Sequence, residues 1–190
     1  EELDGDLDLY DLESAEGLEL PEKIGRDLLL NGLENAEGLK LPREIGGDLL
    51  LNALKNAEGV EFPEKIKGDL QLRDLENAEG LELPQEIGGD LLLYWLRSAE
   101  GLELPEKIGG DLQLSGLESA EGVELPSSFD GPLLLNKEIT YVPREILDSV
   151  RTNLSKDKLE ELYAECDRRE QGQDDEQRKE AIRDRLADED

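Results

Sequence analysis

Leucines alternate with other residues in two short segments that return along most of the chain. In one stretch these segments are Leu28-x-Leu30 and Leu39-x-Leu41. A period of two places such leucines on one side of an extended strand and the residue between them on the other side. The pattern therefore predicts two short β-strands in each unit, with the leucines lining an interior.

The unit that carries these segments is a repeat of 21 residues. Its marker is an Ala-Glu-Gly tripeptide, with the alanines at Ala15, Ala36, Ala57, Ala78, Ala99 and Ala120. Such a unit has no room for a helix of normal length, and its glycines and prolines are typical of turns. One coil cannot bury its own apolar face, so the coils must stack on one another. We predict a mainly β fold, a parallel β-solenoid of about seven 21-residue coils with a C-terminal helical cap.

The repeat also predicts the interior and the corners of each coil. The expected interior residues of one coil are Leu28, Leu30, Leu33, Ala36, Leu39, Leu41 and Ile45. The Gly46-Gly47-Asp48 segment is expected to form a corner in which glycine adopts a positive φ. We expect the corner aspartate to accept N–H groups of its own turn. A column of Ca²⁺ sites along these aspartates is the alternative.

The period changes at Pro143, so we expect a solenoid domain at residues 1–142 and a helical cap with a charged tail at 143–190. Pro143 suits the first turn of a short helix that runs through Val150.

A second helix is predicted by an apolar stripe with helical spacing, namely Leu159, Leu162, Tyr163 and Cys166. We expect this helix to cover the open end or the side of the solenoid. The Gln171-Gly172-Gln173 segment is expected to separate it from a third helix, which extends outward or pairs with another chain. Self-association through the C-terminal helices therefore stays open.

The phrase Leu39-x-Leu41-Pro42-x-x-Ile45, followed by a Leu-x-Leu strand, resembles leucine-rich repeats, particularly the short bacterial kinds. The resemblance spans residues 3–146, and it implies protein binding, which is what most members of that class do. The usual consensus has Asn or Cys where this chain has Leu33 and its equivalents. We therefore expect a straighter, flattened solenoid in preference to a horseshoe.

Differences among the coils gather at the outward residue of the first strand and in the two residues after that strand. The candidate partner-binding residues in this stripe are Leu29, Leu50, Arg73, Leu92, Tyr94 and Trp95. Trp, Tyr and Arg are the residues that most often anchor protein interfaces. The sequence predicts an exposed apolar row that binds a partner. The alternative is that these leucines are ordinary strand residues or pack beneath the tail.

The chain has 50 acidic and 21 basic residues, with a net charge of -29. This balance argues against nucleic acid and anionic membranes as partners, because both bind clustered Lys and Arg. No apolar run approaches the ~20 residues that cross a bilayer. The chain has no His and one cysteine, Cys166, so we expect no catalytic residue, no cofactor and no enzyme.

The leading hypothesis is a non-enzymatic scaffold that presents the variable strand face to a protein partner. Two alternatives stay open. One is a structural or engineered repeat protein with no specific ligand, and the other is an acidic mimic of a polyanion.

Overall fold

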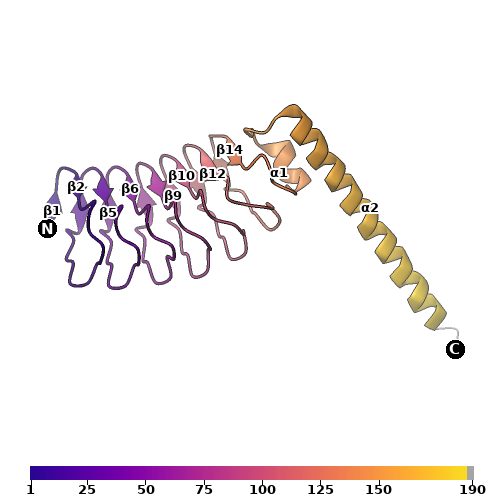
Figure 1. Cartoon of the computed structure of the whole chain (residues 1–190), viewed down its shortest axis with the longest axis horizontal. Coiled ribbons are helices and arrows are strands. Elements are labelled where there is room, and N and C mark those ends of the chain that lie inside the picture. The colour runs from indigo at the N-terminus through magenta and orange to yellow at the C-terminus, as the bar shows by residue number, and fades with distance from the viewer. Residues whose placement is uncertain (188–190) are drawn as a thin grey trace.

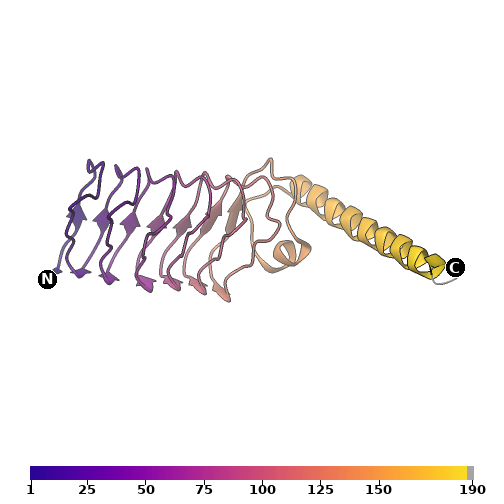
Figure 2. The same cartoon turned by 90° about the horizontal axis from the view of Figure 1, so that it is seen from below.

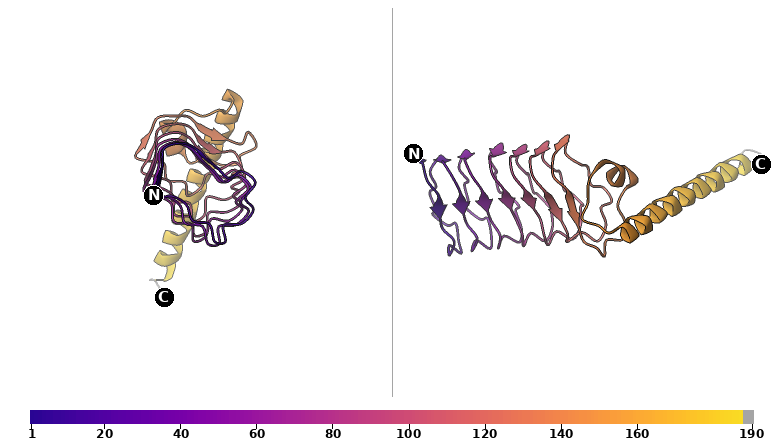
Figure 3. Two further views of the ribbon diagram at one scale, coloured as in Figure 1. Left: turned by 90° about the vertical axis from the view of Figure 1, so that its left-hand side faces the viewer. Right: turned by 90° about the horizontal axis from the view of Figure 1, so that it is seen from above.

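The computed structural model describes the backbone of residues 1–187 and the side chains of residues 1–172. A parallel β-solenoid comes first, as the repeat predicts, and two helices, α1 and α2, follow it (Figure 1). Viewed along their axis, the coils lie nearly on top of one another (Figure 3). They form a gently bent row and not the arc of a horseshoe (Figure 2), which is the straighter geometry that the sequence favours.

Each coil contributes one short strand to each of two parallel sheets, and each sheet has seven strands. Sheet A consists of β1 (Glu2–Leu3), β3 (Lys23–Ile24), β5 (Glu44–Ile45), β7 (Lys65–Ile66), β9 (Glu86–Ile87), β11 (Lys107–Ile108) and β13 (Ser128–Phe129). Sheet B consists of β2 (Leu7–Asp8), β4 (Leu28–Leu29), β6 (Leu49–Leu50), β8 (Leu70–Gln71), β10 (Leu91–Leu92), β12 (Leu112–Leu114) and β14 (Leu133–Leu135). Equivalent residues of successive coils are in register, as in Leu28↔Leu49.

The second strand of each coil does not lie where the leucine pattern predicts it. Leu39-x-Leu41 forms no strand, and sheet A is built from Glu44–Ile45 and its equivalents. Pro42 has no N–H to donate to a ladder, and the N–H of Leu39 bonds to the carbonyl of Ala36 at 3.0 Å. The prediction was wrong because an extended segment alternates its side chains whether or not its backbone joins a sheet.

The interior is a continuous stack of aliphatic side chains. Of the predicted interior residues, those that are buried are Leu28, Leu30, Leu33, Leu39 and Ile45. Leu41 and Ala36 are only half-buried, and Pro42 is buried instead. The prediction fails in this segment because it belongs to no β-sheet, so no backbone hydrogen bonds fix which side chains point inward.

The glycine-rich corner is tight because neighbouring coils approach each other closely there. A Cβ on Gly46 would lie 2.1 Å from the carbonyl oxygen of Gly25, and one on Gly47 would lie 2.0 Å from a carboxylate oxygen of Asp27. Contrary to the prediction, positive φ does not occur in these glycines but in the Ala-Glu-Gly turns, as in Gly38 with 79°. Close approach, and not backbone conformation, therefore requires glycine at the corner.

The corner aspartates join one coil to the next. Oδ1 of Asp27 accepts the N–H of Asp48 at 2.8 Å, and Oδ1 of Asp48 accepts the N–H of Asp69 at 2.8 Å. The predicted bond within the same turn is wrong, because donor and acceptor lie one coil apart. Burial raises the pKa of Asp69, and repulsion from the neighbouring aspartates acts in the same direction.

Lys67 breaks the repeat at this corner, where the equivalent residues are Gly46, Gly88 and Gly109. Those glycine N–H groups bond to the preceding coil at 2.8, 2.9 and 3.0 Å, whereas the N–H of Lys67 lies 3.4 Å from the carbonyl oxygen of Ile45. β5 and β7 share a single register pair. The side chain of Lys67 thus weakens the ladder locally.

The outward residues of sheet A alternate in charge. Along the sheet they are Glu2, Lys23, Glu44, Lys65, Glu86 and Lys107. Lys23 and Glu44 lie 3.4 Å apart, and Glu86 accepts hydrogen bonds from both Lys65 and Lys107. These bonds lower the pKa of Glu86. Opposite charges one coil apart therefore support the register of sheet A.

The last strand of sheet B is covered by the segment that follows α1 (Arg144–Ser149). The N–H of Leu133 bonds to the carbonyl of Arg151 at 2.8 Å. The side-chain amide of Asn153 accepts the N–H of Leu135 at 2.8 Å and donates to its carbonyl at 3.0 Å. This segment supplies partners to a sheet edge that would otherwise be open to pairing.

Lys156–Ala187 form one continuous helix, α2. The predicted break at Gln171-Gly172-Gln173 and the separate third helix are wrong, because one glycine costs only about 1 kcal/mol in a helix of otherwise good helix formers. The first part of α2 packs as predicted, with Leu162 and Cys166 at 0% and 3% exposure, and the rest extends away from the solenoid (Figure 1). Burial raises the pKa of the Cys166 thiol, which disfavours the nucleophilic thiolate.

Candidate functional site

The outward face of sheet B is nearly uncharged. It is formed by the residues that alternate with the buried leucines, namely Asp8, Tyr10, Leu29, Asn31, Leu50, Asn52, Gln71, Arg73, Leu92, Tyr94, Gln113, Ser115, Leu134 and Asn136. Asp8 is the only acidic residue and Arg73 the only basic residue among them, in a chain with 50 acidic residues. We call this surface the sheet B face.

The predicted apolar row on this face is less exposed than the sequence suggests. Leu29 and Leu50 are half-buried, and Leu92 is only 8% exposed. Leu92 lies in register between Gln71 and Gln113, whose longer side chains flank it on both sides. The prediction that Leu92 belongs to an exposed row is therefore wrong, because its side chain is buried.

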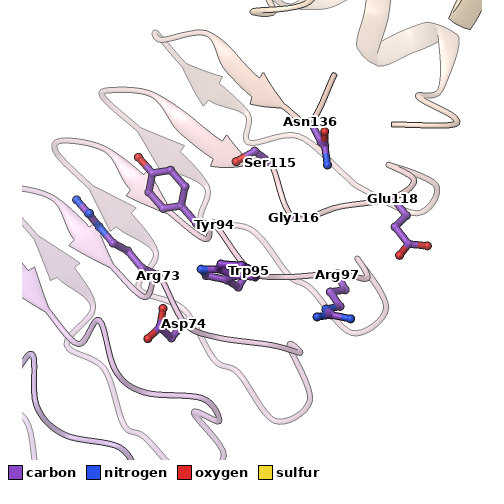
Figure 4. A pocket seen from close by; sticks show the side chains of 9 residues that line it. All are labelled: Arg73, Asp74, Tyr94, Trp95, Arg97, Ser115, Gly116, Glu118 and Asn136. Carbon is purple, nitrogen blue, oxygen red and sulfur yellow. The ribbon is translucent and has the colours of Figure 1, made fainter. Parts of the chain in front are cut away.

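Arg73, Tyr94 and Trp95 do come together, at the end of the strands where the chain turns. Together with other side chains they line a pocket of about 660 Å³ (Figure 4). The lining residues are Arg73, Asp74, Tyr94, Trp95, Arg97, Ser115, Gly116, Glu118 and Asn136. Leu29 and Leu50 lie outside this pocket, so the structure does not join them to the aromatic pair.

The pocket exists because the coil that follows Trp95 has glycine at the equivalent position. A Cβ on Gly116 would lie 2.6 Å from the carbonyl oxygens of both Tyr94 and Leu96. No side chain at that position therefore covers the indole, and Trp95 is 58% exposed. Trp95 also borders a second pocket of about 340 Å³, which is lined by Lys55, Asp74, Glu76, Trp95 and Arg97.

Charged groups of both signs surround the indole. The guanidinium carbon of Arg73 lies 5.3 Å from the centre of the Tyr94 ring, a cation–π distance. Asp74 lies on one side of Trp95, and Arg97 and Glu118 lie on the other (Figure 4). None of these three charged groups has an ion-pair partner within 4.0 Å among the residues that the structure describes.

Sequence reasoning did not select Arg97 and Glu118 as pocket residues. A signal existed, because the equivalent positions in four other coils hold Glu13, Glu34, Lys55 and Glu76, so that basic residues interrupt an acidic column near Trp95. That these residues meet the indole depends on the path of the turn, which the repeat pattern does not reveal.

The residues that line the pocket include neither histidine nor cysteine. The chain has no His, and its single cysteine, Cys166, is buried elsewhere. Within residues 1–172 no three Cys, Asp or Glu side chains are grouped so that they could hold a metal ion. In the described part of the chain, no helix combines the length and the apolar character needed to span a membrane.

Comparison with models of protein families finds no match for this chain. No curated protein and no solved structure matches it either.

Proposed function

We propose that this protein is a non-enzymatic interaction scaffold that binds a protein partner through the sheet B face and the adjoining pocket, with Tyr94 and Trp95 as anchors. The single observation that carries the proposal is the neutrality of this face in a chain with a net charge of -29. The cores of protein interfaces are depleted in charged residues and enriched in aromatic residues and arginine. The sheet B face has this composition, and the rest of the solenoid surface does not.

The exposed aromatic side chains support the proposal. Trp95 is 58% and Tyr94 37% exposed, next to Arg73. An exposed Trp beside a Tyr and an Arg matches the residues that contribute most to binding in interfaces. The pocket volume of about 660 Å³ is large enough to take up one or two side chains of a partner.

We also propose that the coil is distantly related to leucine-rich repeats. The Leu-x-Leu-Pro-x-x-Ile phrase and the parallel strand that follows it support this relation. Binding through a strand-bearing face is what such a relation implies. Self-association through α2 stays a prediction, supported by the extension of this helix beyond the solenoid (Figure 2).

Substitution of the anchor tests the proposal. A library of displayed protein fragments is selected on the wild-type protein, and the dissociation constant of each selected fragment is then measured for Trp95→Ala and Tyr10→Ala. Tyr10 is a matched control, because it is 59% exposed and lies on the same face far from the pocket. We expect Trp95→Ala to weaken binding at least tenfold, as for an interface hot spot, and Tyr10→Ala to change it less than twofold.

Two outcomes would contradict the scaffold. Fragments that bind wild type and Trp95→Ala equally well would show that the aromatic pair is not the anchor. Fragments that are strongly basic, bind all variants alike and dissociate steeply with added salt would favour the polyanion mimic.

A further inference from the structure

Three tyrosines of this chain have an arginine over their ring, whereas Trp95 has no described cation over its ring. Guanidinium groups lie over Tyr94, Tyr141 and Tyr163, at 5.3, 3.7 and 5.6 Å from Arg73, Arg169 and Arg144 respectively. No described Arg or Lys lies over Trp95. Indole is the strongest cation–π acceptor among the side chains. The best acceptor of the solenoid is thus left without a cation, although Trp95 is 58% exposed.

The charged groups beside Trp95 are also available. On sheet A, opposite charges on neighbouring coils pair with each other, as Lys23 and Glu44 do at 3.4 Å. Around the pocket, Asp74 and Glu118 have no described ion-pair partner within 4.0 Å, even though Arg97 lines the same pocket. Arg73 and Arg97 balance the charge of the two carboxylates in the pocket as a whole, but neither carboxylate is held in an ion pair with a described residue, so both can form one with a ligand over the open indole.

We infer that the Trp95 pocket binds a basic side chain of the partner, with the cation over the indole and its charge balanced by Asp74 and Glu118. The inference rests on the proposed function and names the chemistry of the group that the scaffold recognises. Arginine suits the site better than lysine, because a planar guanidinium stacks on an aromatic face and also donates paired hydrogen bonds to a carboxylate.

The charge of the whole protein supports a basic partner. A net charge of -29 attracts cationic surfaces over a distance of about one Debye length, ~8 Å at physiological salt. The neutral sheet B face then allows close approach without burying many carboxylates, which would be costly. The net charge attracts a basic partner over a distance, and the uncharged sheet B face lets that partner come into contact at a low desolvation cost.

The positive charge of Arg97 repels a basic guest and attracts an acidic one. Substitution of Arg97 therefore shows which sign of charge the pocket binds. If the guest is basic, removal of the Arg97 charge strengthens binding. If the guest is acidic, the same substitution weakens binding, because Arg97 would be its partner. Asp74 and Glu118 give the reverse pattern.

The test uses the full chain, whose single Trp makes fluorescence a local reporter of the pocket. The probes are the blocked peptides acetyl-Gly-Arg-Gly-amide, its Lys and Gln analogues, and its Glu analogue. We expect the Arg peptide to bind most tightly and the Glu peptide least. Asp74→Asn and Glu118→Gln should each weaken binding of the Arg peptide about two- to fivefold, and Arg97→Gln should strengthen it by a similar factor.

Matched controls separate the pocket from diffuse attraction. Asp11 and Glu34 occupy the positions equivalent to Asp74 and Glu118 in coils remote from Trp95. Asp11→Asn and Glu34→Gln remove the same charges, and we expect each to change the affinity less than twofold. Circular dichroism of every variant checks that the solenoid is intact.

The inference is overturned if the Glu peptide binds more tightly than the Arg peptide, or if Arg97→Gln weakens binding of the Arg peptide. Equal effects of Asp11→Asn and Asp74→Asn would also overturn it, because only the net charge would then matter. Failure of the peptide series while Trp95→Ala still abolishes partner binding would reject the basic guest and keep the scaffold. Peptide binding without any Trp95-dependent partner would keep the pocket chemistry and reject the scaffold.

Discussion

Sheet A and sheet B have the same number of strands and parallel register, yet their outward faces differ in kind. Sheet A presents a ladder of alternating Glu and Lys, in which neighbouring coils pair by charge. The outward face of sheet B presents polar amides and half-buried leucines with one acidic and one basic residue, and the Trp95 pocket lies at its end.

The difference shows that inward and outward residues of a solenoid have separate roles. The backbone ladders and the inward aliphatic side chains hold both sheets together, so outward residues are free to serve other ends. On sheet A they support register and keep the surface charged, which opposes edge and face association. On sheet B they vary from coil to coil and form the face through which we propose that a partner binds.

The largest expected effect concerns two neighbouring leucines of β6. If the outward residues of sheet B are free to serve binding, they contribute little to stability. Leu49 points inward with 0% exposure, whereas Leu50 points outward and is half-buried. We expect Leu49→Ala to lower the free energy of unfolding by about 2–5 kcal/mol, because it leaves a cavity in the stack. Leu50→Ala should lower it by about 1 kcal/mol or less. Urea unfolding followed by circular dichroism measures both, and equal losses would contradict these separate roles.

The next effect concerns the corner at which Lys67 weakens sheet A. Lys67→Gly restores the repeat and allows the hydrogen bond from the N–H of residue 67 to the carbonyl of Ile45, now 3.4 Å long, to shorten to the length found in the equivalent coils. We expect it to raise the free energy of unfolding by about 1 kcal/mol, even though an added glycine has an entropy cost in the unfolded chain. Lys40→Gly is the control, because Lys40 is exposed and outside the corner, so this change should be neutral or destabilising. A loss of stability with Lys67→Gly would show that the lysine is not strained.

The smallest effect concerns the charge ladder. Lys65→Glu places three acidic residues in a row on sheet A and should lower the free energy of unfolding by about 0.5 kcal/mol at low salt. The loss should shrink in 1 M salt, where charges are screened within ~3 Å. Gln71→Glu on sheet B adds an acid between Leu50 and Leu92, so we expect a smaller loss with little salt dependence. Melting temperatures at two salt concentrations compare them, and a salt-independent loss for Lys65→Glu would mean that packing and not charge is involved.

The candidate site was predictable only in part. Arg73, Tyr94 and Trp95 could be found from the sequence because they interrupt a regular repeat. Leu92 could not be assigned correctly, since its exposure depends on the two glutamines that flank it in the neighbouring coils. The space in front of Trp95 depends in turn on Gly116, one coil away.

The sequence by itself determined the architecture. A spacing of 21 residues places equivalent residues on successive coils, and the leucines at fixed positions identify most of the interior. These features are readable because every coil meets a copy of itself, so the local pattern already contains its own packing partner.

The tertiary structure alone decided which extended segments join a sheet. Leu39-x-Leu41 and Glu44–Ile45 are both extended candidates, but Pro42 and the turn bond of Leu39 leave only the second segment free to pair. It also decided that α2 runs unbroken through Gly172 and that the corner carboxylates bond to the next coil. The corner bonds depend on contacts between residues of different coils, and the unbroken helix depends on the summed preference of a long segment, so neither is visible in a single 21-residue unit.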